Sequence, residues 1–574
     1  MSYLAPIDEI KFILKDIFKI GDKSSEQRNL DLEYDTIEAI LEEVSRLAEN
    51  ILSPINRDSD LYPAIHKRGK VVLPPSFAKA YNAIAEGGWI GISGDPKYGG
   101  LGLPLVVTTF VNEILSSGCL SLALNPLMTQ GQIEALEHHG SEKIKKLFLP
   151  RLNSGEWSGT MNLTEPQAGS DVGALRSRAS MAEDGLYRIN GQKIYISWGD
   201  HDLSSNICHL VLARLSGSPE GTKGISLFLV PKYLPDDSGH LVSRNNVNTV
   251  SLEKKMGLHG SPTVVLEYDN AKAWLIGEEN KGMAAMFTMM NNARLGVGVQ
   301  GLSQSELATQ KALAYAKQRK QGKNLKSFEN GSTAIINHAD IRRNLLIMKS
   351  LTFVSRALCF DTAISNDLAK LEDDLSLHQK VSFLTPITKA FCTEVGCRVT
   401  DLCIQIHGGM GYIEDTGVSQ LYRDVRITAI YEGTNGIQAM DLVGRKLGSG
   451  GRVAHTIIKE VANNEKMVAS RFPKLAAAVS IARKNVTKAL DWMLSQDELN
   501  ERFCGASPFL NAFALLLGAN YMLKTILVSN DTNRRELAEF YIYQILPFAS
   551  VEASIACKGS DHLYGTSSFL ANRS

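Results

Sequence analysis

Hydrophobic positions change their spacing twice along this chain. Up to about residue 153 they recur at the three-to-four-residue spacing of an amphipathic helix, as they do between residues 35 and 52. From about residue 156 they form short apolar runs typical of strands, at Leu210–Leu212, Leu227–Val230 and Val264–Leu266. After Gly282 the helical spacing returns and continues to about residue 446. This order predicts a helical region, a β region and a second helical region.

The clearest local signal in the β region is the dipeptide Asn190-Gly191. Residues 187–189 and 193–196 flank it with β-forming side chains. Asn-Gly favours the two-residue turns that join antiparallel strands, because both residues tolerate a positive φ. We therefore expect a β-hairpin at this position.

A glycine-rich run at residues 448–451 marks the last predicted boundary. Beyond it, residues 453–495 and 508–555 again have helical spacing, and their acidic and basic side chains are nearly balanced. The chain is therefore expected to adopt an α+β fold, mainly α, with four domains. These are residues 1–155 (N-terminal, helical), 156–278 (β), 279–450 (C-terminal, helical) and 451–574 (an additional helical region).

Composition agrees with a large globular protein. The 574 residues are 44% hydrophobic and 21% charged, which is enough for several packed domains. Lys+Arg and Asp+Glu each total 61, so no overall electrostatic field would recruit nucleic acid or anionic lipid.

The cysteines and the N-terminus indicate a reducing, cytosolic setting. The eight cysteines form no Cys-x-x-Cys pair, and Cys392, Cys397 and Cys403 lie in one helical stretch, which favours buried free thiols over disulfides or a metal site. The first residues lack both an apolar secretory core and an Arg-rich transit pattern. The apolar run 510–528 is interrupted by polar residues and predicts a buried helix rather than a membrane span.

The most informative motif is Tyr431-Glu432-Gly433-Thr434-Asn435-Gly436. It places a lone carboxylate between an aromatic ring and a flexible turn. In a mostly apolar pocket such a carboxylate is poorly hydrated, so its pKa rises and it can serve as a general base. Taken alone, the motif would be an ordinary Asn-Gly turn with an exposed glutamate.

A second motif, Met161-Asn162-Leu163-Thr164-Glu165-Pro166-Gln167-Ala168-Gly169-Ser170-Asp171, changes that interpretation. The two motifs resemble the two signatures of the acyl-CoA dehydrogenase family, in the same order and at similar spacing. The resemblance runs from about Trp89 to Lys446, and it is strongest to a bacterial branch with an additional C-terminal region that includes 3-methylmercaptopropionyl-CoA dehydrogenases. It implies a β-barrel-like middle domain between two helical domains, of which the second is a four-helix bundle.

The resemblance also implies an FAD site. Met161, Leu163 and Thr164 would line the flavin ring, with Tyr195 and Ser197 where relatives have a tryptophan and a threonine. Ser170 would lie near the pyrophosphate and the CoA chain. The remaining expected cofactor contacts are Arg319, Gln321, Gln405, Gly408, Gly409, Thr434 and Asn435. Gln405, Gly408 and Gly409 would approach the FAD of a neighbouring subunit, which implies a homodimer or a higher homo-oligomer.

Two of these assignments have simpler alternatives. Tyr195 could be an aromatic ring that only packs the β domain, and Arg319 with Gln321 could be a solvated helix end.

For the substrate, the resemblance implies contacts from Ser170, Asn291, Arg294 and Gly433. Glu432 would remove the α-proton of an acyl-CoA while the β-hydride passes to flavin N5, which yields a trans-2-enoyl-CoA. Some branches carry their base just before the arginine that Arg294 matches, and this chain has Ala293 there. The expected electron acceptor is an electron-transferring flavoprotein. No metal is expected.

The chain departs from the family pattern at three positions. These are Asn162, where a small residue is usual, Gln420, where a lysine or arginine is usual, and Gly436, where a glutamine is common. Two other functions stay open. One is a DNA-associated flavoprotein of the alkylation-response type, which would need a basic face on residues 451–574. The other is an acyl-CoA oxidase, which uses the same base and flavin. The acyl group, whether short, medium, branched or sulfur-containing, is also open.

Overall fold

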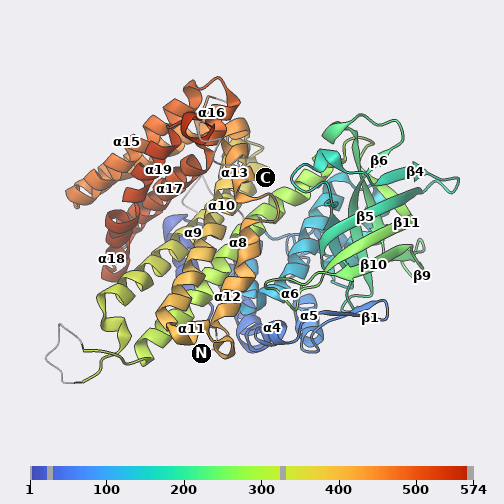
Figure 1. Ribbon diagram of the computed structural model, residues 1–574, viewed down its shortest axis with the longest axis horizontal. Helices are drawn as coiled ribbons and strands as arrows, with labels where there is room; N and C mark the ends of the chain where they lie inside the picture. Colours follow the sequence, from blue (N-terminus) through green and yellow to red (C-terminus); the bar gives the residue numbers. More distant parts are fainter. Residues whose placement is uncertain (1–2, 22–29, 31, 324–330, 449, 565–574) are drawn as a thin grey trace, which may run out of the picture. The chain divides into compact units, whose positions relative to one another are not determined.

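The computed structural model describes residues 3–21, 30, 32–323, 331–448 and 450–564 (Figure 1). Contacts divide the chain into two compact units. The β unit comprises Ser2–Ala5 and Glu43–Gly296, and the helical unit comprises Pro6–Glu42 and Val297–Ser574 together with Met1. Both predicted classes of structure are present, and the prediction of a mainly helical α+β fold is confirmed.

Helices form the first part of the β unit. Their bounds are Tyr34–Leu47 (α2, which contains the division between the units), Ala48–Leu52 (η2), Ser53–Ile55 (α3), Asp58–Leu61 (α4), Phe77–Glu86 (α5), Leu105–His139 (α6) and Glu142–Asn153 (α7). A short hairpin of β1 (Ile65–Lys67) and β2 (Lys70–Val72) interrupts them. α6 is almost wholly buried and packs against strand β3, so it forms the core helix of this unit.

The sheet of the β unit has seven strands. They are Trp157–Asn162 (β3), Arg178–Met181 (β4), Tyr187–Ser197 (β5), Asn206–Leu215 (β6), Ile225–Pro231 (β7), Val247–Leu252 (β10) and Thr263–Ile276 (β11). Pairing runs from β11 through β5, β4, β6 and β7 back to β11, so five strands close a ring. β3 and β10 extend this ring, and β8 (Tyr233–Pro235) and β9 (Leu241–Arg244) form a separate pair. The expected β-barrel-like domain is confirmed.

The predicted hairpin at Asn190-Gly191 is wrong. β5 continues straight through these residues, and the irregularity lies in its partner β11, between Tyr268 and Ala271. The Asn190 side chain accepts a hydrogen bond from the Asn270 main-chain nitrogen at 2.8 Å and so supports that bulge. A Cβ at Gly191 would lie 2.4 Å from the Ser177 Oγ. The Asn-Gly pair therefore serves close packing and a neighbouring bulge instead of a turn.

The helical unit is built around three long helices, α8 (Gly282–Gln318, whose first part belongs to the β unit), α9 (Ala339–Glu372) and α10 (Leu375–His407). α8 and α10 approach closely where Gly301 faces Gly396, because a Cβ at Gly396 would lie 3.0 Å from the Gly301 Cα. Shorter elements follow α10: Gly409–Tyr412 (α11), Glu414–Thr416 (η7), Val418–Val425 (α12), Arg426–Ala429 (η8), Asn435–Asp441 (α13) and Leu442–Lys446 (η9). α12 and α13 pack on α10 and complete the bundle.

The N-terminal helix α1 (Ile7–Phe12), with η1 (Ile13–Ile17), belongs to the helical unit. Glu9 lies 3.5 Å from Arg356 of α9, and Arg356, which is fully buried, also binds Glu306 of α8 at 2.6 Å. This charged cluster joins segments that are far apart in the sequence, and sequence periodicity carries no signal for it.

The C-terminal extension adds eight helical segments to the helical unit among the described residues: Arg452–Ala469 (α14), Pro473–Ser495 (α15), Leu499–Cys504 (α16), Ala506–Val528 (α17), Thr532–Phe540 (α18), Tyr541–Ile545 (η10), Pro547–Ala556 (α19) and Asp561–Tyr564 (α20). α17 lies beside α15 and α19 (Figure 1). It also contacts α14, α9 and α10. Tyr521 of α17 donates a hydrogen bond to Asp361 of α9 at 2.8 Å, and Lys380 of α10 binds the same carboxylate at 2.7 Å. Buried polar contacts therefore join the extension to the bundle.

Among the residues that the structure describes, two helices, α6 and α17, are long and apolar enough to cross a membrane by length and composition. Their most apolar windows are 94% and 78% buried inside the structure, as in the core helices of a folded protein. The predicted burial of residues 510–528 is confirmed.

Candidate active site

Glu432 lies in a short loop with an unusual backbone, between η8 and α13. Its φ is +56° and that of Gly433 is +81°, so two successive residues adopt the left-handed conformation. For a residue with a side chain this conformation costs about 1–2 kcal/mol. Such a geometry persists only where the surroundings impose it, and it is typical of functional sites.

The aromatic neighbour of Glu432 is half-buried and neutral. The Tyr431 hydroxyl donates a hydrogen bond to the Gln300 Oε1 of α8. Burial raises the pKa of Tyr431 far above its ordinary value, and the negative charge of Glu432 raises it further. Glu432 itself is half-buried beside this ring.

The start of α13 is fixed by side chains of the motif itself. The Thr434 Oγ1 accepts the main-chain N–H of Ile437 at 3.3 Å and caps the helix. The Asn435 Oδ1 accepts a hydrogen bond from the buried Lys389 Nζ at 2.9 Å, and its Nδ2 donates to the Glu394 Oε1 at 2.8 Å. Because the Asn435 side chain is engaged with α10, any contact between Asn435 and the flavin would come from its main chain.

The first signature follows β3, and one buried ion pair holds it in place. The Glu165 carboxylate accepts hydrogen bonds from the Lys193 Nζ of β5 at 2.8 Å, from the Arg176 main chain at 2.6 Å and from the Ser177 Oγ at 2.7 Å. The Lys193 Nζ also donates to the Leu163 carbonyl at 2.9 Å. Met161, Leu163 and Thr164 are half-buried along this segment.

Burial and the opposite charge together shift the pKa of both groups. Burial alone would raise the pKa of Glu165, but the Lys193 ammonium and the hydrogen bonds lower it to about 2. Burial lowers the pKa of Lys193 to about 8 in spite of the opposite charge. Glu165 is therefore ionised at neutral pH, and its role is to organise the loop.

The unusual Asn162 is the centre of a buried polar network. The Thr160 Oγ1 donates to the Asn162 Oδ1 at 2.8 Å, and the Asn162 Nδ2 donates to the Tyr268 hydroxyl at 2.5 Å. Since the Thr160 proton goes to Asn162, Thr160 accepts a hydrogen bond from the Nδ1–H of His209 at 2.7 Å. Burial lowers the pKa of His209 to about 3, so this ring is neutral, as expected for a structural histidine. The departure at Asn162 thus supports the end of β3 from inside the barrel.

Tyr195 presents its ring to the outside. Tyr195 lies at a bulge of β5, between Lys193, which pairs with Leu266, and Ile196, which pairs with Val264. Its φ is +59°, and the residue is 62% exposed. The alternative that Tyr195 packs the β domain is therefore wrong. The ring that does so is Trp198, which is fully buried and stacks on Phe77. Ser197, next to the bulge, is half-buried.

The loop that carries Ser170 is exposed and is anchored by Arg214 of β6. The Arg214 guanidinium donates hydrogen bonds to the carbonyls of Gly173 at 2.5 Å and of Gly221 at 2.7 Å. Arg214 and Lys193 were both missed by the sequence analysis. Arg214 is a basic residue in the mostly apolar strand β6, which is a usable signal, whereas Lys193 lies in a strand with several other polar residues.

The expected substrate residues on α8 differ in their surroundings. Arg294 is buried, and its guanidinium lies 6.0 Å from the centre of the Phe287 ring. Asn291 lies on the same helix, and its side chain is outside the described residues. The alternative position for a base is occupied by Ala293, which is buried and carries no carboxylate.

One ring stack links α8, just before Arg319 and Gln321, to the end of α10, which carries Gln405 and precedes Gly408 and Gly409. Tyr315, one turn before Arg319, stacks on His407 with 4.3 Å between ring centres, and His407 directly precedes Gly408. Arg319 and Gln321 are both exposed, and the Arg319 Nη2 donates to the Gln321 Oε1 at 3.2 Å.

The glycines of this turn present open backbone. Gly408 has a φ of +59° and a ψ of −139°, which only glycine adopts readily. A Cβ at Gly408 or Gly409 would meet no atom of this structure within 4 Å. An exposed guanidinium and open glycine main chain are each suited to a phosphate-bearing ligand, and the exposed Tyr195 ring with the Thr164 and Ser197 hydroxyls fits a flavin ring.

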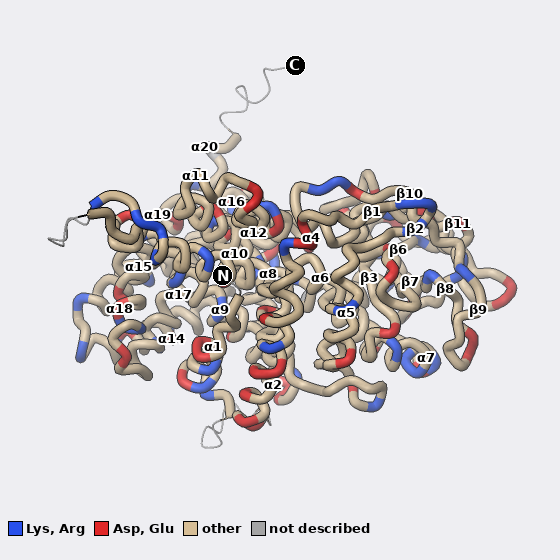
Figure 2. The backbone as a smooth tube through the Cα atoms, turned by 90° about the horizontal axis from the view of Figure 1, so that it is seen from below, with Lys and Arg blue, Asp and Glu red and all other residues tan. Residues whose placement is uncertain are grey.

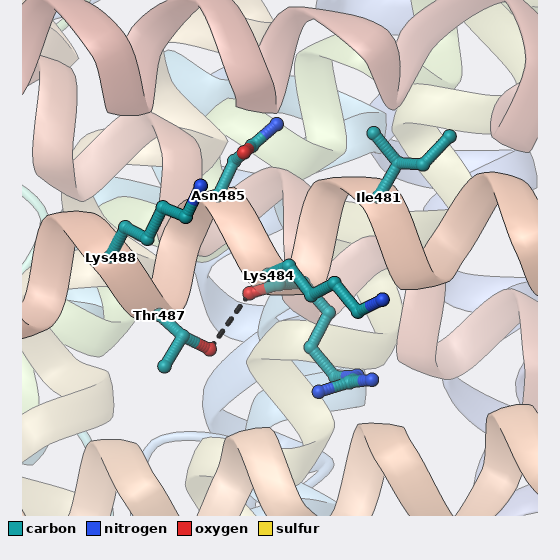
Figure 3. Close-up of a pocket in the computed structure, with 6 residues that line it drawn as sticks. Ile481, Lys484, Asn485, Thr487 and Lys488 are labelled. Atoms are coloured by element: carbon teal, nitrogen blue, oxygen red, sulfur yellow. Dashed lines mark hydrogen bonds between the residues drawn. The ribbon is translucent and has the colours of Figure 1, made fainter.

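An open depression on α15 lies apart from these residues in the sequence. It is lined by Ile481, Arg483, Lys484, Asn485, Thr487 and Lys488 (Figure 3). Arg483 is paired with Glu465 at 2.8 Å. Acidic and basic residues are interspersed along the described chain (Figure 2), so these few cations do not amount to a strongly basic face.

Comparison with known proteins identifies the class. Three family models of acyl-CoA dehydrogenases match the chain: the N-terminal domain at residues 35–156, the middle domain at 160–271 and the C-terminal domain at 280–447. A fourth model, described as "Acetyl-CoA dehydrogenase C-terminal like", matches residues 453–566. The chain belongs to the acyl-CoA dehydrogenase family.

Individual relatives cover nearly the whole chain. It is 43% identical to a 3-methylmercaptopropionyl-CoA dehydrogenase of Ruegeria pomeroyi, over 89% of this chain and 88% of the relative. It is 33% identical to a butyryl-CoA dehydrogenase of Syntrophomonas wolfei, over 92% and 90%. The fold is similar to that of Caenorhabditis elegans ACDH-11, with a TM-score of 0.83 and 21% identity over 100% of this chain and 96% of the other.

These findings confirm the predicted family, and with it an FAD-dependent oxidoreductase that acts on an acyl-CoA. The DNA-associated and oxidase alternatives are not favoured, since the relatives are named as dehydrogenases.

The ion pair gives the first testable prediction. Lys193→Met leaves the buried Glu165 carboxylate without its cation, so we expect a loss of about 3–5 kcal/mol in the free energy of unfolding, together with weaker flavin retention. The double variant Glu165→Gln/Lys193→Met should lose less, because no uncompensated charge remains.

Urea unfolding and the flavin-to-protein absorbance ratio measure these effects. Lys484→Met, on the exposed face of α15, is the control and should change stability by about 0.5 kcal/mol or less. A Lys193→Met variant as stable as the wild type would show that the pair does not organise the loop.

Proposed function

We propose that the protein catalyses α,β-dehydrogenation of an acyl-CoA thioester with Glu432 as the base. The observation that carries this proposal is the loop itself: a half-buried carboxylate beside a neutral tyrosine, in a left-handed backbone that surrounding side chains hold. The alanine at position 293 removes the alternative base found in some branches.

In this mechanism the residues of the chain bind, orient and accept a proton. Glu432 takes the α-proton through its carboxylate, and its main-chain N–H is expected to donate to the thioester carbonyl, which stabilises the enolate-like charge. The neutral Tyr431 adds no competing charge beside the base. Bound FAD supplies the hydride acceptor. Arg294, Gly433 and Ser170 are proposed contacts of the CoA ester, and the cofactor contacts are those expected from the sequence.

The acyl group is proposed to be short. The 43%-identical relative is named for a 3-methylmercaptopropionyl ester and the 33%-identical relative for a butyryl ester. Both acyl groups have a short backbone and differ in the thioether. We therefore propose 3-methylmercaptopropionyl-CoA or an unbranched short-chain acyl-CoA as substrate.

We also propose a homo-oligomer and an electron-transferring flavoprotein as acceptor. Met410, Tyr412 and Ile413 are 51%, 85% and 48% exposed, and they follow the glycine turn directly. A cluster of exposed apolar residues next to open, phosphate-suited backbone fits a site that a second subunit completes. The acceptor rests on the family resemblance alone.

Glu432→Gln tests the base. The amide keeps the shape of the side chain and cannot take the proton. We therefore expect the variant to bind flavin, and its rate of flavin reduction to fall by about 10²–10⁴-fold or more. Anaerobic titration of the yellow protein with acyl-CoA measures it. Glu414→Gln, which removes an exposed carboxylate on η7, should bleach normally. Normal bleaching in Glu432→Gln would rule out Glu432 as the base.

A panel of saturated acyl-CoAs tests the substrate class. Butyryl-CoA and 3-methylmercaptopropionyl-CoA should bleach the flavin faster than esters of eight or more carbons, a chain length on the order of twice that of butyryl, because each surplus methylene that finds no room loses its burial energy of about 0.8 kcal/mol. Faster reduction by the long esters would contradict the short-chain proposal. Peroxide formed during turnover in air would instead favour an oxidase.

Gly408→Ala tests the glycine turn. An alanine cannot adopt the φ of +59° and ψ of −139° of Gly408 without strain. We therefore expect the variant to lose flavin and to form a smaller oligomer. The absorbance ratio and light scattering after size-exclusion chromatography measure both. Gly450→Ala, at another open glycine with a φ of +69°, should retain flavin. Equal behaviour of the two variants would remove the turn from the cofactor site.

A further inference from the structure

The loop that carries Glu432 is tied to the fold by a buried glutamine, Gln438. This residue lies on α13, and its side chain is fully buried. Its Nε2 donates to the main-chain carbonyl of Glu432 at 3.2 Å and to that of Gly433 at 3.3 Å. One amide group thus holds the main chain of both left-handed residues.

These two hydrogen bonds fix the orientation of whole peptide groups, including the N–H groups that follow the two carbonyls. In a planar trans peptide the N–H points opposite to the C=O. Holding the carbonyl of Glu432 therefore directs the N–H of Gly433 away from α13, and holding the carbonyl of Gly433 does the same for the N–H of Thr434. The main chain that follows the Glu432 Cα is set in the same way, and with it the direction in which the carboxylate leaves the backbone.

The orientation of the Gln438 amide is determined by its partners. Both are carbonyl oxygens, which can only accept, so the NH₂ group must face them. The Gln438 Oε1 is consequently buried, with no hydrogen-bond partner among the described residues. A buried acceptor without a partner is unfavourable. Its presence indicates that the donor end of this side chain serves a purpose that offsets the cost.

Other side chains hold the flanks of the loop. Tyr431 is bound to Gln300 on one side, and Asn435 is bound to Lys389 on the other. Between these anchors the left-handed pair could relax to an ordinary turn, because Gly433 has wide conformational freedom. Gln438 acts on this intervening segment.

We propose that Gln438 is a positioning residue for catalysis, which holds Glu432 and Gly433 in the left-handed conformation that aims the base at the α-proton. The inference rests on the proposed function of Glu432. It predicts a loss in the rate of proton abstraction, with little effect on binding of flavin or acyl-CoA.

Two variants test it. Gln438→Met keeps the length of the side chain and removes the donor, and we expect flavin reduction to slow by about 10–100-fold at unchanged flavin content, since a small displacement of a reacting group has effects of this size. The kinetic isotope effect with Cα-deuterated butyryl-CoA should rise, because proton abstraction becomes more rate-limiting.

Gln438→Glu adds a signature that a merely structural role would not produce. When protonated, the introduced carboxyl can donate one hydrogen bond to a loop carbonyl, and when ionised it can donate none. The reduction rate of Gln438→Glu relative to Gln438→Met should therefore fall as pH is raised through the pKa of the introduced group. If Gln438→Met fails to fold, the same fall is measured for Gln438→Glu relative to the wild type.

Gln420→Met is the matched control. Gln420 is also buried in the helical unit, and its amide donates to Asp424 at 3.3 Å, away from Glu432 in the sequence. It should lose stability without any change in the isotope effect. Wild-type reduction rates in both Gln438 variants, with bleaching lost in Glu432→Gln, would overturn this inference alone. Normal bleaching in Glu432→Gln would overturn the proposed function, and this inference with it.

Discussion

The candidate site depends on one constraint: its main chain is irregular and partly buried, so its polar groups must be satisfied outside any helix or ladder. The two signature segments meet this constraint in the same way. Each is held by a fully buried side chain that donates to main-chain carbonyls, Lys193 for Leu163 and Gln438 for Glu432 with Gly433. Rigid support of this kind allows an irregular segment to present a side chain in one direction, as catalysis requires.

Periodicity was sufficient to predict the α+β class and the burial of α17, because long amphipathic patterns and apolar runs follow directly from burial. The barrel-like sheet was predicted from the family resemblance. The hairpin at Asn190-Gly191 shows where this reasoning ends. The dipeptide does favour a turn, but cross-strand packing against Ser177 and the bulge at Asn270 decided its conformation. Likewise, α1 contacts α9 through Glu9 and Arg356, a pairing for which local sequence carries no information.

The candidate site was predictable in its residue types and less so in its orientations. Motif resemblance located Glu432, and the structure then supplied what a motif cannot: the left-handed backbone, the outward ring of Tyr195, and the engagement of the Asn435 side chain with Lys389. The supporting residues were missed because they lie in ordinary strand or helix patterns. A lysine or glutamine at a buried position is still informative, since it must find partners and those partners are often functional backbone.

Gly436 shows why the support of the second signature matters in this chain. Its backbone does not require glycine, since a Cβ there would meet only the Thr434 Oγ1, at 3.9 Å. Glycine in a helix costs about 1 kcal/mol relative to alanine, so the first turn of α13 is intrinsically weak. The Thr434 cap, the bonds of Asn435 to α10 and the bonds from Gln438 to the loop offset this weakness. The start of α13 and the conformation of Glu432 are therefore stabilised together, and a change that loosens one is expected to loosen the other.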